Sequence, residues 1–191
     1  MRPAFHRSSS EIKPSIASSM TAVTAAGRIR AEKIIVVQRK SVRQEYALRA
    51  GADILLEPGK DDVVAEIYRL TGGAGADIAF ETTGSEQCLL LLLESIKAAG
   101  TLVVTSIWEG PATLHPNLLV MKERQMVGSI CYCGDFPKVI ELLDSGRIPA
   151  EGYVTKKICL EDVVKEGFAS LTGPEKKSQV KILVTPDCNL L

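Results

Sequence analysis

Two short stretches of the chain contain candidate ligand-binding or metal-binding residues. The glycines of TGGAGAD (residues 71–77) could let backbone N–H groups approach a phosphate. Cys131 and Cys133 alternate along an apolar stretch, so both thiols would lie on one face of a strand. Two thiolates alone cannot complete a tetrahedral zinc site, and a buried free cysteine often behaves as a small apolar residue, so we expect no metal there.

The elements that must position these residues follow a regular alternation from Lys33 onward. The run KIIVVQ (33–38) is continuously apolar and β-branched, as in a strand that is buried on both faces. Further strands are predicted at 52–57, 76–82, 101–107, 125–132 and 180–186, and helices at 41–51, 61–73, 85–100, 136–145 and 161–171. This alternation with short turns predicts an α/β fold of the doubly wound, Rossmann-like type, with a parallel sheet.

The position of the glycine-rich stretch argues against a nucleotide site. A dinucleotide fingerprint runs strand, G-x-G-x-x-G, helix, and its ligand lies at the carboxyl ends of the strands. TGGAGAD instead follows the helix predicted at 61–73 and precedes the strand predicted at 76–82. It is therefore predicted to be a helix cap and turn at the amino ends of the strands. The true fingerprint should precede the strand at 33–38, but Gly27 is the only glycine before residue 51.

Composition excludes several classes of function. The 23 Lys and Arg balance the 23 Asp and Glu, which argues against a nucleic-acid surface or a polybasic membrane patch. The longest apolar run, 88–93, is too short to span a membrane. The odd count of 5 cysteines, without a CxxC pair, favours a reduced, cytoplasmic protein.

The first thirty residues differ in composition from the rest. Arg2, Arg7, Lys13, Arg28 and Arg30 are accompanied by one acid, Glu11, and by many serines. Such a segment is typical of a divergent tail that leads into a short helix, and the alternative is a mitochondrial transit peptide. Both interpretations of residues 1–30 stay open from the sequence.

The chain from Ala31 to Pro186 resembles a known family of enzymes. The resemblance rests on an ordered series of strings: AEKIIVV, RAGAD, LTGGAGADIAFETTG, AAGTLVVTSIW, GDFPKVIELLDSGRI and QVKILVTP. Together they are similar to the zinc-type medium-chain alcohol and polyol dehydrogenases, within their butanediol dehydrogenase branch. The resemblance implies an NAD(P)-binding domain at 31–150 and, at 151–191, a segment that packs on the family's catalytic domain.

The same resemblance implies an activity and a set of missing parts. Family members oxidise a secondary alcohol, pass hydride to NAD or NADP, and hold a catalytic zinc in an N-terminal domain. This sequence has no GHE-type zinc motif and only two histidines, His6 and His115, so we expect neither zinc ligands nor catalytic residues in it. The family's first cofactor-domain strand, central in the order 3-2-1-4-5-6, also has no evident match, because Pro14 and its polar neighbours suit a central strand badly. We therefore expect a sheet that lacks its first strand and glycine turn, and a chain prone to association or instability.

The resemblance also carries cofactor-binding positions onto this chain. Gln38, at the end of the second strand, replaces the acid that NAD-binding members usually use for the adenine ribose, and it is followed by Arg39 and Lys40. These cations and Arg43 would favour the 2′-phosphate of NADP, or they are simply solvated residues. The remaining positions follow the fourth, fifth and sixth strands: Thr82, Thr83 and Gly84; Ser106 and Ile107; Ser129, Ile130 and Cys131.

Three hypotheses of function remain. The first is a cofactor-domain fragment of a dehydrogenase that has no activity by itself. The second is a non-catalytic module that pairs with itself or with an intact relative through the edge strand near 125–131, as the family's subunits do. The third is a small but complete enzyme, which would need a metal or an acid near the alcohol oxygen.

Overall fold

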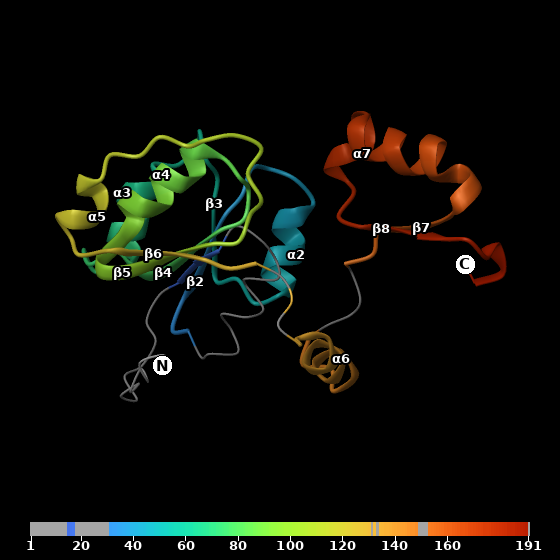
Figure 1. Cartoon of the computed structure of the whole chain (residues 1–191), viewed down its shortest axis with the longest axis horizontal. Coiled ribbons are helices and arrows are strands. Elements are labelled where there is room, and N and C mark those ends of the chain that lie inside the picture. The colour runs from blue at the N-terminus through green and yellow to red at the C-terminus, as the bar shows by residue number, and fades with distance from the viewer. Residues whose placement is uncertain (1–14, 18–30, 131, 133, 149–152, 191) are drawn as a thin grey trace.

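A six-stranded parallel sheet forms the centre of the molecule. The structure is a computed structural model that describes residues 15–17, 31–130, 132, 134–148 and 153–190. The strand order is β3-β2-β1-β4-β5-β6, and every neighbouring pair is parallel. The strands are β1 (Ser15–Ala17), β2 (Ile34–Val37), β3 (Ile54–Leu56), β4 (Ala76–Glu81), β5 (Ile96–Val104) and β6 (Gln125–Gly128) (Figure 1). The predicted doubly wound α/β fold is confirmed.

The prediction of a missing first strand is wrong. Ser15–Ala17 form β1 in the central position, where Ser15 lies in register with Ile34 of β2 on one side and with Ile78 of β4 on the other. The paired segment begins after Pro14 in the sequence, so the ladder does not need the N–H that proline lacks. The predicted loss of the glycine turn concerns residues 18–30, which lie outside the described residues, as do most of residues 1–30.

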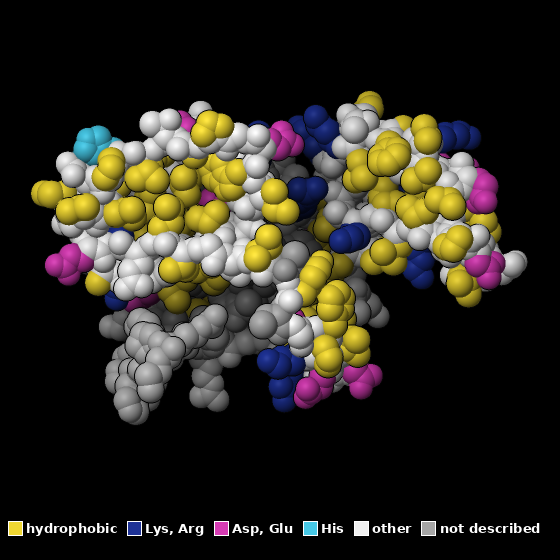
Figure 2. All heavy atoms as spheres, in the orientation of Figure 1, with side chains coloured by type: hydrophobic (Ala, Val, Ile, Leu, Met, Phe, Trp, Pro, Cys, Tyr) yellow, Lys and Arg dark blue, Asp and Glu magenta, His cyan; other side chains and the backbone are white. Residues whose placement is uncertain are grey.

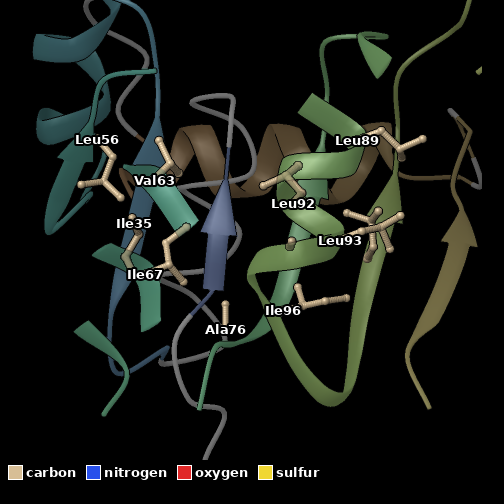
Figure 3. Packing of buried hydrophobic residues seen from close by; sticks show 11 residues of the cluster. Ile35, Leu56, Val63, Ile67, Ala76, Leu89, Leu92, Leu93 and Ile96 are labelled. Carbon is tan, nitrogen blue, oxygen red and sulfur yellow. The ribbon is translucent and has the colours of Figure 1, made fainter. Parts of the chain in front are cut away.

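Helices cover both faces of the sheet. Helices α3 (Val63–Leu70) and α4 (Glu86–Ser95) lie over one face, where their apolar side chains meet Ile35 of β2 and Ala76 of β4 (Figure 3). Helix α2 (Arg43–Arg49) packs Ala47 against Ile34 and Val36 on the opposite face. Because successive strand residues point to opposite faces, β2 contributes to both clusters, which confirms its prediction as a fully buried strand.

The glycine-rich stretch is a cap and turn, as predicted. Gly73 N–H donates to Tyr68 O at 2.7 Å beyond the end of α3, and Gly72, Gly73 and Gly75 all have positive φ. A Cβ on Gly75 would lie 2.8 Å from the backbone nitrogen of Lys97. Glycine is therefore required there by both conformation and close packing, at the amino edge of the sheet.

One predicted helix boundary is wrong. The helix predicted over 85–100 ends at Ser95, and β5 begins directly at Ile96, which pairs with Ala76. Ala98 and Ala99 are good helix formers by propensity, but Ala99 takes a positive φ of 54° inside the strand, where Gly100 packs closely against β4. Pairing with β4 therefore overrides the local preference for helix.

The last part of the chain adds a smaller sheet. β7 (Lys156–Cys159) and β8 (Ile182–Thr185) pair in parallel, with η1 (Leu160–Asp162), a π-helical turn η2 (Val163–Phe168), α7 (Ala169–Thr172) and η3 (Pro174–Lys177) between them. This part of the chain, called the β7–β8 unit (residues 153–190), lies to the right of the large sheet in Figure 1. Val42 N–H donates to Lys177 O at 3.3 Å between the two parts. The boundaries 1–30, 31–150 and 151–191 stay predictions.

Two of the five cysteines are bonded to each other. Cys159, at the end of β7, and Cys188, in the terminal turn η4 (Cys188–Leu190), form a disulfide with a Cα–Cα distance of 5.4 Å. The prediction of reduced cysteines is therefore wrong for this pair. The odd number of cysteines argued against a framework of several disulfides, but it does not exclude a single one. Among the described residues Cys88 is a free thiol.

Apolar side chains gather on two exposed surfaces (Figure 2). One surface lies along α5 (Asn117–Val120) and β6, where Val120, Met121 and Val127 are exposed. The other lies on the β7–β8 unit, where Val164 and Phe168 are exposed. Helix α6 (Phe136–Asp144) also exposes most of its apolar side chains. No helix in the described part of the chain is long and apolar enough to cross a membrane.

Candidate functional site

The predicted cofactor residues gather at the carboxyl edge of the large sheet. Thr82, Thr83 and Gly84 follow β4, Ser106 and Ile107 follow β5, and Ser129 and Ile130 follow β6. Gln38 and Arg39 follow β2 at the same edge, whereas Arg43 begins α2 and Cys131 lies outside the described residues. In open parallel sheets this is the edge at which ligands bind.

Two neighbouring hollows occupy this edge. The first, called the β2-side hollow, measures about 350 Å³ and is lined by Gln38, Arg39, Thr83 and Cys88 among other residues. The second, called the β5-side hollow, measures about 420 Å³ and is lined by Thr83, Gly84, Ile107 and Trp108 with their neighbours. Both volumes are in the range of small-molecule sites. Because Thr83 lines both hollows, they can accommodate the two ends of one extended ligand.

The buried carboxylate of Glu81 holds the wall between the hollows in place. Glu81 ends β4 with a fully buried side chain. Its Oε1 accepts hydrogen bonds from Thr83 N at 2.7 Å, Thr83 Oγ1 at 2.6 Å and Gly84 N at 3.1 Å. Its Oε2 accepts a hydrogen bond from Ser106 Oγ, which lies on the neighbouring loop. One side chain therefore fixes two strand-end loops relative to each other.

The ionised form of Glu81 is favoured by its donors. Burial acts to raise the pKa of this carboxyl, but the hydrogen bonds from Ser106, Thr83 and Gly84 outweigh it and leave the pKa lowered. The carboxylate is therefore charged at neutral pH. Sequence analysis missed this residue, although an acid at the carboxyl end of the strand ADIAFE, the end at which ligands bind in such sheets, was a signal that could have identified it.

Further hydrogen bonds connect the strand ends and loops along the carboxyl edge of the large sheet. Thr105 N–H and Oγ1 both donate to Glu81 O, at 2.9 and 3.0 Å, and Ser129 N–H donates to Val104 O at 2.9 Å. Gly84 has a φ of 67°, and a Cβ there would lie 3.1 Å from Ile107 O. The loops after β4, β5 and β6 are thus held in fixed positions relative to one another. This arrangement suits them to present backbone groups to a flat ligand.

The end of β2 is also ordered, but it is more open. Gln38 N–H donates to Leu56 O at 3.0 Å, and Gln44 Nε2 donates to Gln38 O at 3.1 Å, which ties the start of α2 to the strand end. Arg39 and Lys40 are exposed. Among the salt bridges of the described residues, none involves Arg39, Lys40 or Arg43, so their charges are available to an anion.

The described residues around the two hollows do not fit a zinc site. The described chain has one group of three candidate ligands, Cys159, Glu161 and Cys188, and all three belong to the β7–β8 unit. His115 Nδ1 instead accepts a hydrogen bond from Asn117 N at 3.3 Å at the start of α5. Among the described residues, the candidate zinc ligands therefore lie away from the two hollows.

Comparison with known proteins identifies the family. The family model described as zinc-binding dehydrogenase matches residues 19–145. The chain belongs to the zinc-binding dehydrogenase family. It is 47% identical over 167 residues to an (R,R)-butanediol dehydrogenase of Bacillus subtilis (strain 168), covering 87% of this chain and 46% of that protein. It is 40% identical over 156 residues to the (R,R)-butanediol dehydrogenase of Neisseria gonorrhoeae (strain ATCC 700825 / FA 1090), covering 81% of this chain and 44% of that protein.

Solved structures support the same assignment of this zinc-binding dehydrogenase family member. A crystal structure of 2R,3R-butanediol dehydrogenase from Bacillus subtilis superposes with a TM-score of 0.83 and 40% identity, over 93% of this chain and 52% of that chain. The chain thus spans about half the length of the relatives that it matches. The resemblance to zinc-type dehydrogenases is confirmed, and the roles of the individual site residues stay predictions.

Proposed function

We propose that this chain is the cofactor-binding portion of a zinc-type alcohol or diol dehydrogenase. The observation that supports this most directly is the pair of hollows sharing Thr83 at the carboxyl edge of the sheet. A nicotinamide dinucleotide is an extended ligand of this kind, and the named relatives are butanediol dehydrogenases. The proposed activity of the whole enzyme is oxidation of a secondary alcohol or a diol.

Each hollow would hold one end of the cofactor. Gln38 and Arg39 would contact the adenine ribose in the β2-side hollow. Ser106, Ile107, Ser129, Ile130 and Cys131 would supply the nicotinamide side. When bound, the nicotinamide ring supplies the acceptor for the hydride. The chain's own contribution is to bind and orient that ring, and Glu81 does so indirectly by fixing the loops after β4 and β5.

The charges at the end of β2 favour NADP over NAD. Gln38 carries no negative charge that would repel a 2′-phosphate, and Arg39 lies beside it on the same hollow. A hydrogen bond to a charged group contributes about 1.5–3 kcal/mol, and 1.4 kcal/mol corresponds to tenfold in affinity. We therefore expect NADPH to bind at least about tenfold more tightly than NADH.

Fluorescence offers a direct test, because Trp108 is the single tryptophan and lines the β5-side hollow. Binding of NADH or NADPH should quench its emission by energy transfer to the dihydronicotinamide. Gln38→Glu should reverse the preference, whereas Lys60→Gln, which changes a charge outside the residues that line either hollow, should not. Absence of quenching by either cofactor at millimolar concentration would refute the proposed binding site.

We further propose that this chain does not turn over an alcohol by itself. Activation of the alcohol oxygen needs a metal or an acid. The described residues form no group of three metal ligands at the hollows, and the acids that line the β5-side hollow, Glu86 and Glu109, are both exposed. Incubation with butane-2,3-diol and either oxidised cofactor should give no formation of NADH or NADPH, with or without added zinc. Measurable turnover would favour the hypothesis of a small, complete enzyme.

A second candidate function is pairing through the outer edge of β6, which pairs with no other strand in the part of the chain that the structure describes. β6 bonds to β5 on one side, and its residues Met126 and Val127 are each 41% exposed. An uncovered strand edge can extend a sheet into another subunit. Light scattering should then show a dimer that Val127→Lys disrupts and that Val164→Lys, an exposed apolar site on the β7–β8 unit, does not. A monomer at micromolar concentration, with no capture of an intact relative, would refute this pairing.

A further inference from the structure

We propose that reduction of the Cys159–Cys188 disulfide opens a site for a divalent cation of the zinc type, with Glu161 as the third ligand. The Cys159 and Cys188 sulfurs and a Glu161 carboxylate oxygen all lie within 4.8 Å of one another. Two thiolates and a carboxylate, completed by a water molecule, form a donor set that suits tetrahedral zinc. This site is independent of the proposed cofactor site.

The spacing of the donor atoms matches such a site. Zinc bonds of about 2.3 Å to sulfur and 2.1 Å to oxygen, at tetrahedral angles, place sulfur and oxygen about 3.6 Å apart. Cys188 Sγ lies 3.7 Å from Glu161 Oε2. The two sulfurs must separate to about 3.8 Å when a metal replaces their bond, again from the zinc–sulfur distance. Both cysteines are at the surface, since Cys159 is half-buried and Cys188 is exposed, so this rearrangement is not resisted by a packed core.

Local structure brings the three residues together from distant positions in the sequence. Cys159 ends β7, and Glu161 follows it within the turn η1. Cys159 is in register with Thr185 of β8, three residues before Cys188. The strand pairing therefore holds both cysteine-bearing segments side by side.

Local hydrogen bonds order the tail that follows β8. Asp187 N–H donates to Thr185 Oγ1 at 3.2 Å, and Thr185 Oγ1 donates to Asp187 O at 3.0 Å. Asn189 N–H and Nδ2 both donate to Asp187 Oδ1, at 3.0 and 2.9 Å. The turn that carries Cys188 is thus held by contacts that do not involve the disulfide, so the ligand geometry can persist after reduction.

Opening the site is a two-electron step with a defined reductant. A phosphine attacks one sulfur, the S–S bond breaks, and water supplies the oxygen of the phosphine oxide and the protons of the two thiols. Zinc binding then releases the two thiol protons, because the thiolate is the ligand form. A disulfide oxidant such as oxidised glutathione reverses the step by exchange: it accepts two electrons from the metal-bound dithiolate and two protons from water, leaves as two thiols, and the re-formed Cys159–Cys188 bond releases the metal. The pair would thus bind metal only in its reduced form.

Cobalt titration tests the proposal in the full chain with Cys88, Cys131 and Cys133 replaced by serine. After phosphine reduction, one Co²⁺ should bind with a thiolate charge-transfer band in the near ultraviolet, and Zn²⁺ should displace it. The unreduced chain should show no band. A reduced chain without the band at millimolar cobalt would overturn the proposal.

Variants of the ligands sharpen this test. Cys159→Ser or Cys188→Ser should remove at least half of the band intensity. Glu161→Gln should keep the band but weaken cobalt binding at least about tenfold. Loss of a group that only orients a metal ligand already lowers metal affinity about 10–100-fold, and Glu161 is proposed as a ligand itself. Glu45→Gln, an exposed acid on α2, is the matched control. A band that survives removal of both cysteines, or equal affinities in Glu161→Gln and Glu45→Gln, would exclude the three-ligand site.

A measurement on the unmodified chain avoids any effect of the substitutions on folding. Zinc should slow the alkylation of Cys159 and Cys188 by iodoacetamide in the reduced protein, as mapped by peptide mass. Cys88 provides the internal reference, because it lies outside the proposed site. Equal alkylation of Cys159 and Cys188 with and without zinc would overturn the proposal.

Discussion

Replacing Glu81 by glutamine should destabilise the protein and loosen the loops at the carboxyl edge of the large sheet. The carboxylate accepts four hydrogen bonds, three at Oε1 and one at Oε2. An amide of the same size can keep the donors of Thr83 and Gly84 on its oxygen, but without the charge that makes such bonds roughly twice as strong. Its nitrogen would face the Ser106 hydroxyl, which must turn to become the acceptor.

The expected loss follows from these bonds. Hydrogen bonds to a charged group contribute about 1.5–3 kcal/mol, and the neutral bonds that remain contribute about 0.5–1.5 kcal/mol. Each retained bond therefore loses about 1–1.5 kcal/mol. Because bonds that share one acceptor do not contribute additively, we expect the free energy of unfolding to fall by the equivalent of two such bonds, about 2–3 kcal/mol. For a protein of this size 1 kcal/mol corresponds to roughly 2–4 °C in Tm, so the Tm should fall by roughly 5–10 °C.

The pH dependence of this loss identifies its cause. The pKa of Glu81 is lowered in the folded protein below its ordinary value of 4.5. Its carboxylate therefore contributes stability above the unfolded-state pKa, and this contribution is lost as the pH falls through the folded-state pKa. The difference between the parent chain and Glu81→Gln should be full near pH 7 and shrink progressively below about pH 4.5, which urea unfolding at several pH values can measure.

A matched substitution separates this effect from a general loss of charge. Glu66→Gln removes an acid whose ion pair with Arg69 is exposed on α3, and such a pair contributes less than about 1 kcal/mol. The reasoning would be refuted if Glu81→Gln behaved like Glu66→Gln at pH 7. A deficit that stayed constant down to pH 3 would also refute it, because the lost charge would then not be the cause.

Three further substitutions probe the scaffold by thermal and urea unfolding. Asp62→Ala removes the cap of α3, where Oδ1 accepts from Ala65 N at 3.1 Å, and should cost about 1 kcal/mol, whereas Asp62→Asn should cost little. Gly75→Ala should lower the free energy of unfolding by more than about 2 kcal/mol, because φ at this residue is +93° and the new Cβ would clash with backbone atoms. Gly72→Ala has open space around it and should cost about 1 kcal/mol, so equal effects of the two variants would refute the role of close packing. Arg124→Met should cost about 2–4 kcal/mol, because the buried guanidinium donates to three backbone carbonyls that methionine cannot satisfy, and a loss below 1 kcal/mol would contradict this role.

The parts of the fold that were predicted from the sequence are those with a local signal. β2 has an uninterrupted apolar run, and the stretch TGGAGAD has a fixed place between a helix and a strand, so both were predicted from neighbouring residues alone. The carboxyl-edge positions Thr83 and Ser106 came instead from the resemblance to the dehydrogenase family, which placed them after the fourth and fifth strands.

The parts that were missed depend on contacts between distant segments. β1 has three residues and little pattern of its own, and its place is determined by pairing with β2 and β4. Glu81 and Ser106 are separated by 25 residues, and Cys159 and Cys188 by 29. The spacing of these residues in the sequence does not predict their contacts, because the contacts form only when the strands pair in the sheets.

The central strand also has a consequence for how the molecule could be divided. β2 and β4 both pair with β1 and not with each other, so the continuity of the six-stranded sheet depends on Ser15–Ala17. A chain without these residues would hold two half-sheets, β3-β2 and β4-β5-β6, each with an unpaired inner edge. A separate peptide that carries this short strand would have a vacant, two-sided slot to enter. The protein is thus a natural starting point for a complementation reporter, in which peptide binding restores one sheet.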